Sequence, residues 1–206
     1  MRTPPTKPAA QERRQALLQG VKRLADAFDP DPQHSAQVTA LSLSLFDRLS
    51  GLHGYRGRPR LLLEIAAVLH DIGWSRTRNS GHHKHSRDMI LEGNLPGLTE
   101  RERTLCALVA RYHNKAMPDK KRHRAFAELS RQDRELVSWL AAILRVADGL
   151  DCNHAGAAGG IREIVADEKQ LIISLTEPDR CAAETRRARQ KSDLLERTTK
   201  RKVIFR

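Results

Sequence analysis

The sequence predicts a mainly α-helical bundle followed by a small α+β appendage. Apolar residues recur at three- and four-residue steps over most of the first 150 positions, which is the spacing of a buried helix face. The residue pattern changes near Cys152, where a Gly- and Ala-rich linker precedes two short β-like runs. A chain of 206 residues can form one good core, or one domain with a small appendage. We therefore expect a disordered lead-in over residues 1–10, a helical domain over 11–155 and a basic α+β appendage over 160–206.

The composition favours an anionic partner. The net charge is +12, from 37 Lys and Arg against 25 Asp and Glu, which suits a nucleotide, a polyphosphate, a nucleic acid or an acidic surface. The alternative is an Arg-rich surface without a specific partner. Three scattered cysteines indicate a reducing cytoplasm and no disulfide framework. The longest apolar runs, such as 139–144, are far too short for a membrane span, and the first residues lack the apolar core of a signal peptide.

The helices of the bundle follow from apolar spacing and from the residues that end them. The first spans 11–28 and ends before Pro30 and Pro32, which cannot continue a helix. Thr99 and Glu102 form a predicted capping box at the start of a later helix. Polar or Gly-rich loops are expected over 51–59, 73–81 and 115–124. The further helices are expected over 33–50, 60–70, 81–91, 99–112 and 130–148.

The appendage is expected to contain a hairpin, a helix and a strand. The two β-like runs, 161–166 and 171–176, flank a polar turn and read as the hairpin. A very basic helix over 182–198 and a strand over 203–205 follow. The basic segments contain almost no aromatic residues, which weakens a surface for stacking single-stranded nucleic acid but leaves phosphate binding open. The basic helix could equally serve a homodimer interface.

Four residues in apolar settings point to a metal centre. An apolar run leads directly into His70 and Asp71, and a buried imidazole and carboxylate are costly unless something pairs with them. A divalent metal accepts both as ligands. His34 and Asp148 lie on the apolar stripes of two other predicted helices. A single buried His or Asp is more often a core group or a cap. Four such residues in the apolar settings of separate predicted helices are not readily explained by chance.

Two further histidines, His82 and His113, sit at helix boundaries and extend the set to four His and two Asp. That set is enough for two metals that share Asp71 as a bridge, and it suits Fe, Mn, Zn or similar ions. His83 and His85 compete with His82 for the ligand role. Basic residues flank the expected pocket and could hold phosphate oxygens, the alternative being a solvated face. They are Lys84, Arg111 and Lys115.

Five segments in this order resemble the HD-domain phosphohydrolase superfamily, whose signature is His…His-Asp…Asp on a helical bundle. The nearer resemblance is to the C-terminal HD region of the exopolyphosphatase/guanosine pentaphosphate phosphatase (Ppx/GppA) family, and it covers residues 30–155. The resemblance implies metal-dependent phosphoester hydrolysis, with His82 and His113 joining a two-metal site. Trp74 stands where many HD hydrolases place a Lys. The five segments are 70–73, 81–86, 95–98, 111–115 and 144–151.

Two functions are expected from this resemblance. The first is a stand-alone phosphohydrolase in which a metal-bound hydroxide attacks a nucleotide, a guanosine alarmone or a short polyphosphate. Its ligands would include the catalytic pair His70 and Asp71, and basic side chains would stabilise the developing charge. The second is a non-catalytic polyphosphate-binding module that partners a separate phosphatase. In the polyphosphatase family the chemistry resides in an amino-terminal actin-like domain, which we do not expect in this chain.

Overall fold

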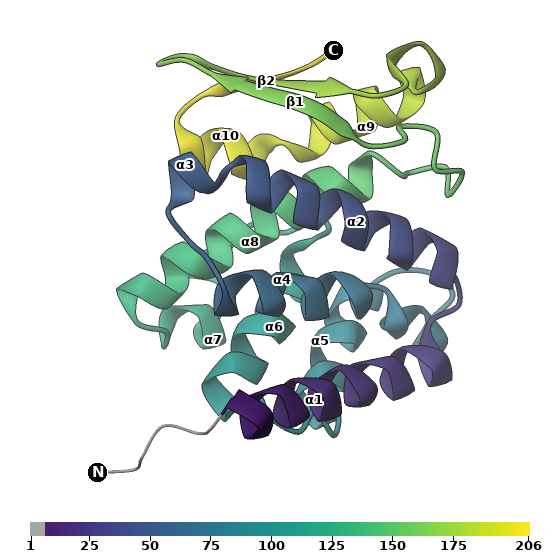
Figure 1. Cartoon of the computed structure of the whole chain (residues 1–206), viewed down its shortest axis with the longest axis vertical. Coiled ribbons are helices and arrows are strands. Elements are labelled where there is room, and N and C mark those ends of the chain that lie inside the picture. Colours follow the sequence, from purple (N-terminus) through teal and green to yellow (C-terminus); the bar gives the residue numbers. More distant parts are fainter. Residues whose placement is uncertain (1–6) are drawn as a thin grey trace.

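The structure, a computed structural model, describes residues 7–206, with side chains from residue 11 onward. The predicted lead-in falls largely on residues 1–6, which lie outside the described part, and the first helix begins at Lys7. The mainly α-helical fold with a small α+β appendage is confirmed (Figure 1). The helices are α1 (Lys7–Phe28), α2 (Pro32–Arg48), α3 (Ser50–His53), α4 (Arg58–Val68), α5 (His82–Glu92), α6 (Glu100–Tyr112), α7 (Arg124–Ala127), α8 (Arg131–Gly149), α9 (Ala182–Lys191) and α10 (Asp193–Thr199). The shorter elements are the 3-10 helices η1 (Ile72–Arg76) and η2 (Pro178–Arg180) and the strands β1 (Ile161–Ala166), β2 (Gln170–Leu175) and β3 (Lys202–Phe205).

Helix α8 is the centre of the molecule. Its side chains Val137, Leu140 and Leu144 are fully buried, because α2, α4 and α6 pack along one side and α9 and α10 along the other. Figure 1 shows α8 crossing between the helical bundle and the appendage. This position explains why residues 140–147 of α8 are all buried, whereas its first half has one apolar face and exposed polar residues opposite. It also places the C-terminal end of α8 where both parts of the fold meet.

Helix α6 begins at the predicted capping box. The Thr99 hydroxyl accepts from the Glu102 backbone N–H at 3.2 Å, and the Glu102 carboxylate accepts from the Thr99 N–H at 3.0 Å. The same carboxylate receives two bonds from the Arg58 guanidinium, at 2.6 and 2.8 Å. The Arg58 bonds lower the pKa of Glu102 to about 2. This one carboxylate therefore ties the start of α6 to the start of α4.

Replacing Glu102 by Gln is expected to lower the free energy of unfolding by about 1–2 kcal/mol at pH 7, measured by urea denaturation. The folded-state pKa lies below the ordinary value of 4.5, so this contribution is complete above pH 4.5 and is lost as the pH falls toward 2. The difference between the two proteins should therefore shrink in acid. Glu100→Gln, in the same helical turn but exposed, serves as the control; an equal loss there would contradict the role of the Arg58 pair.

The appendage is a three-stranded sheet covered by α9 and α10. Strands β1 and β2 form the predicted antiparallel hairpin, and β3 pairs with β2 in parallel, with Leu171 opposite Val203. Leu171, Ile173 and Leu175 alternate inward and are buried. This alternation gives the sheet one apolar face, as the period of two in the sequence predicts. In Figure 1 the hairpin lies at the top, above α9 and α10.

Three local predictions differ from the structure. The basic helix predicted over 182–198 is broken at Ser192 into α9 and α10, because the Asp193 carboxylate accepts the Leu194 N–H at 2.8 Å and is held by Arg145. The loop predicted over 73–81 begins as the 3-10 helix η1. Helix α4 ends at Val68, so the His-Asp pair lies in the following turn.

Within residues 7–206, none of the helices combines the length and apolar character that a membrane crossing requires.

Candidate metal centre

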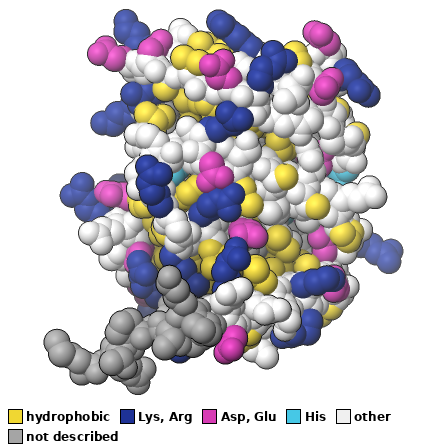
Figure 2. Space-filling model, in the orientation of Figure 1, with side chains coloured by type: hydrophobic (Ala, Val, Ile, Leu, Met, Phe, Trp, Pro, Cys, Tyr) yellow, Lys and Arg dark blue, Asp and Glu magenta, His cyan; other side chains and the backbone are white. Residues whose placement is uncertain are grey.

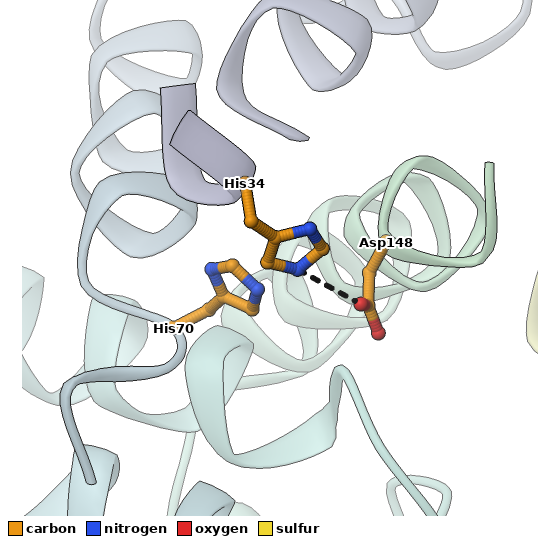
Figure 3. Close-up of side chains that lie close together, drawn as sticks. All are labelled: His34, His70 and Asp148. Atoms are coloured by element: carbon orange, nitrogen blue, oxygen red, sulfur yellow. Dashed lines mark ion pairs between the residues drawn. The ribbon is translucent and has the colours of Figure 1, made fainter. Parts of the chain in front are cut away.

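The six predicted ligands come from five places in the fold and converge around Asp71, five of them at one cavity and His70 buried beside it. His34 lies in the first turn of α2, which starts where the Asp31 carboxylate accepts the His34 N–H at 3.0 Å. His70 and Asp71 occupy the turn between α4 and η1, and Asp148 is in the last turn of α8. Figure 3 shows the imidazoles of His34 and His70 and the carboxylate of Asp148 directed toward one another. His82 begins α5, and His113 follows α6.

The first cluster is formed by His34, His70, Asp71 and Asp148. Nε2 of His34 lies 3.5 Å from Oδ1 of Asp148, the pair joined by the dashed line in Figure 3. It also lies 3.9 Å from Oδ2 of Asp71, and Nε2 of His70 lies 3.6 Å from that same oxygen. One potential ligand atom from each of His34, His70 and Asp148 falls within 4.8 Å of the others. These spacings suit side chains that share one ion.

The second cluster lies on the other side of Asp71. Oδ1 of Asp71 is 3.3 Å from Nε2 of His82 and 3.4 Å from Nε2 of His113. The two Nε2 atoms face each other at 3.1 Å. Ligand atoms of His70, Asp71 and His113 also fall within 4.8 Å of one another. The Asp71 carboxylate therefore stands between two groups of imidazoles, with Oδ2 toward His34 and His70 and Oδ1 toward His82 and His113.

Hydrogen bonds at the opposite ring nitrogens orient these imidazoles. Nδ1 of His70 lies 2.7 Å from the Ala67 carbonyl, and Nδ1 of His113 lies 2.6 Å from the Ala110 carbonyl. A carbonyl only accepts, so Nδ1 donates in both rings and the lone pair of Nε2 faces the neighbourhood of Asp71. The Nδ1 atom of His34 lies 2.8 Å from the Asp151 carboxylate. This arrangement is the one that metal-binding histidines adopt.

The side chains fit a divalent transition metal. Nε2 of His70 and Oδ1 of Asp71 are buried and have no hydrogen-bond partner among the described residues. Burial lowers the pKa of His70 to about 3 and the pKa of His82 to about 4, and it holds the pKa of His113 well below its usual range. The imidazoles are therefore neutral and able to coordinate. Neutral imidazoles around carboxylates are a donor set typical of Zn, Fe or Mn, and an ion would satisfy the unpartnered atoms.

Gly73 allows His82 to reach the centre. A Cβ at this position would overlap the backbone carbonyl of His82 and lie 2.5 Å from the backbone N of Ser86, so a larger residue would push α5 away. The Gly73 N–H also donates to the Ser86 hydroxyl at 2.9 Å. The backbone of Gly73 thus lies very close to that of α5, which explains why positions 73 and 86 hold the small residues Gly and Ser. It brings the first residue of α5 to Asp71.

Among the three histidines that compete for the ligand position, only His82 lies at Asp71. His83 is buried on a different side of α5, and its ring stands nearly perpendicular to that of His82 at 5.3 Å. Burial and the nearby Arg111 lower the pKa of His83 to about 3. His85 is half-buried and makes no ion pair with an acidic residue in the described chain. The geometry thus selects His82.

The order of these segments can be compared with known families. The sequence profile of Ppx/GppA phosphatase, domain III, matches residues 18–196, which include every predicted ligand. The chain belongs to the Ppx/GppA phosphatase domain III family. The predicted resemblance to this family is therefore confirmed. The match extends beyond the helical bundle into the appendage and ends within α10. In this domain III chain, the appendage and the bundle together build the site.

The cavity at the centre of the domain III chain has a volume of about 240 Å³ and is lined by residues from both parts of the fold. The three predicted phosphate-binding residues do not line it. Lys84 and Lys115 are exposed, and Arg111 is buried outside the cavity, with its guanidinium 5.9 Å from the Tyr112 ring. The lining residues are His34, Asp71, Trp74, His82, His113, Asn114, Asp148, Cys152, His154, Arg187 and Lys191.

The most important residue that the sequence did not reveal is Lys191. Its ammonium contacts the Asp148 carboxylate, and its side chain is only 9% exposed. Burial and the neighbouring Arg145 lower the pKa of Lys191 to about 8. In the sequence it is one of many basic residues in a polar helix. The available signal was Gly149, since a Cβ there would lie 2.7 Å from Cα of Ala188 and keep α9 away from the end of α8.

Proposed function

We propose that this chain is a metal-dependent phosphohydrolase of the HD type. The observation that carries the proposal is Asp71, whose two oxygens face separate groups of imidazoles while Oδ1 lacks a hydrogen-bond partner among the described residues. A bound divalent ion would withdraw charge from phosphoryl oxygens and make water acidic enough to act as a nucleophile near neutral pH. One ion would be held by His34, His70, Asp71 and Asp148, and a second by Asp71, His82 and His113.

The cavity, of about 240 Å³, accepts a terminal phosphate beside the ligands. The substrate would therefore enter with its terminal phosphate toward Asp71 and with the remainder toward the exposed Arg187. A guanosine polyphosphate, a short polyphosphate or a nucleotide meets this condition. The chain belongs to a phosphatase family named for polyphosphate and guanosine polyphosphate substrates. This membership supports a guanosine polyphosphate or a short polyphosphate as the substrate.

Residues around the ligands have separate roles in this proposal. The Lys191 ammonium, already beside Asp148, would hold a phosphoryl oxygen and offset its negative charge. Arg187, which is exposed at the cavity, would attract the rest of the anionic substrate. Trp74 stacks on His82 with ring centroids 4.0 Å apart, so it fixes the orientation of that imidazole and covers it from water. The cavity lining thus supplies both positive charge and an aromatic surface for the proposed reaction.

The proposal is tested by measuring metal and activity in the same preparation. We expect the purified protein to contain one to two equivalents of a transition metal by elemental mass spectrometry, because two ligand groups share one carboxylate. A chelator should abolish hydrolysis of the terminal phosphate of guanosine pentaphosphate or tripolyphosphate and should lower the Tm. Adding the metal back should restore both. Protein that remains without metal after reconstitution, or that hydrolyses equally well without it, would contradict the proposal.

A second function is supported by a different observation. The buried Lys191 ammonium partly balances the acidic cluster without a metal, which suits a non-catalytic module that binds polyphosphate for a separate phosphatase. The net charge of +12 agrees, and Figure 2 shows Lys and Arg side chains spread over the visible face with acidic ones among them. In that case polyphosphate binding would survive Asp71→Asn but not neutralisation of exposed basic residues in 186–202. Metal-dependent hydrolysis would exclude this alternative.

A further inference from the structure

A second and larger cleft lies away from the metal centre. It has a volume of about 1060 Å³ and is lined by residues of α3, α7, the first half of α8, α10 and the 118–121 loop. Its lining residues are all different from those of the metal cavity. Trp139 in the cleft and Asp148 in the centre are nine residues apart on α8, or about 13 Å along the helix axis. The proposed phosphatase reaction makes no use of this cleft.

One part of the cleft is aromatic. The His53 ring stacks on Tyr55 with centroids 5.5 Å apart and meets the Trp139 ring edge-on at 5.4 Å. Nδ1 of His53 accepts the Tyr55 N–H at 2.9 Å, and Nε2 lies 2.9 Å from the Phe46 carbonyl and therefore donates. Both ring nitrogens are satisfied in the neutral imidazole, and burial lowers the pKa of His53, so the ring stays uncharged. The cleft thus offers a fixed, uncharged aromatic wall against which a planar ring can stack.

The rest of the cleft is strongly basic. Its lining includes five Lys or Arg residues and two acidic residues, for a formal balance of +3. Glu135 is already paired with Arg131 at 3.0 Å, and Asp119 accepts the Lys121 backbone N–H at 2.7 Å. The side chains of Lys120 and Lys121 make no ion pair with other described residues. The basic lining residues are Lys120, Lys121, Arg131, Arg134 and Arg197.

Arg197 connects the cationic part to the appendage. Its Nη2 donates to the Pro118 carbonyl at 3.2 Å, which leaves most guanidinium donors free for an anion. The bond also holds the 118–121 loop against α10. Lys120 and Lys121 on this loop and Arg197 on α10 are therefore held close together at the cleft. An aromatic wall with unpaired cations beside it suits a ligand that is planar at one end and polyanionic at the other.

We propose that this cleft is a binding site for a nucleoside phosphate. The base would stack on the Trp139 ring with Tyr55 at its edge, and the phosphates would bind Lys120, Lys121 and Arg197. The volume agrees with a small-molecule site rather than with an extended groove for a nucleic-acid strand. An inorganic polyphosphate would use only the cations and would leave the aromatic wall without a role. The proposal is independent of the phosphatase function, because no residue is shared with the metal centre.

The experiment measures binding of ADP, GDP and inorganic pyrophosphate by calorimetry. It uses the Asp71→Asn protein with a chelator present, so that no bound metal contributes to ligand binding. Lys120→Ala/Lys121→Ala is expected to weaken all three ligands by roughly tenfold or more. Trp139→Leu is expected to weaken ADP and GDP by roughly tenfold and to leave pyrophosphate within about twofold. Tyr55→Ala, at a half-buried position, gives a second test of stacking if the Trp139 variant does not fold.

The charge-matched control is Arg13→Ala/Arg14→Ala, which removes two exposed cations from α1. It should leave ADP binding within about twofold, because these residues lie outside the cleft. Three results would overturn the proposal. They are no binding of either nucleotide, nucleotide binding that is indifferent to both aromatic substitutions, and a loss in the control equal to that in the Lys120/Lys121 variant.

Discussion

Replacing Asp71 by Asn is expected to remove the metal and to lower the phosphatase kcat by about a hundredfold to a thousandfold or more. The carboxylate has Oδ2 at 3.6 Å from His70 and Oδ1 at 3.3 Å from His82, so it serves both ligand groups. An amide has nearly the same shape but no negative charge, and its NH₂ group cannot coordinate an ion. Wild type and variant should be compared side by side by elemental mass spectrometry and by initial rates of phosphate release.

The control for this substitution is Asp26→Asn on α1, where the carboxylate is exposed and pairs with Lys22. It removes the same charge and should leave metal content and kcat unchanged. Circular dichroism should show the same helical content for all three proteins, since amide and carboxylate occupy the same volume. If the Asp71 variant retains its metal and its full turnover, the metal does not act at this centre and the proposed mechanism is wrong.

Replacing Lys191 by Met is expected to lower kcat by about a hundredfold while raising the affinity for the metal. The two effects have opposite directions because the ammonium has two partners. It would hold a phosphoryl oxygen during the reaction, and it occupies the Asp148 carboxylate when no metal is bound. Met keeps the length of the buried side chain without its charge. The measurements are kcat at saturating metal and the metal dissociation constant by competition with a chromophoric chelator.

The matched control is Arg189→Met, an exposed position on the same helix. It removes one positive charge from α9 and should change neither quantity by more than about twofold. If Lys191 had only a structural role, Lys191→Met would lower metal affinity together with kcat, because α9 would separate from α8. Either that result or an unchanged kcat would exclude the proposed contact between Lys191 and the phosphoryl group.

The bundle could be predicted because each long helix carries its own evidence. A helix such as α8 buries a continuous apolar face, so its period is visible without knowledge of its neighbours. The ligands were visible for a related reason: His70 and Asp148 are polar groups where such a period requires apolar ones. That they lie together in space follows from the family resemblance and not from spacing within any single helix.

The remaining features depend on contacts between distant segments. The break at Ser192 arises because Arg145 binds Asp193 at 2.8 Å, a contact across 48 positions that no local pattern contains. The direction of basic side chains is equally invisible, since Lys84 and Lys191 both sit in polar surroundings in the sequence. In the fold, Lys84 is exposed, whereas Lys191 is buried against Asp148. A polar pattern shows which residues can reach water, not which of them turn inward.

The hydrogen bond between His34 and Asp151 spans 117 positions of the chain. Bringing such distant residues together costs loop-closure entropy that only later contacts repay. During synthesis the helices α2, α4, α5 and α6 are all made before Asp148, Asp151 and Lys191. For that period the imidazoles are present without two of the acidic groups and without the ammonium that later surround them. The group of His34, His70, Asp71 and Asp148 is therefore completed late in synthesis, whereas the proposed ligands of the second group, His70, Asp71 and His113 among them, are already present.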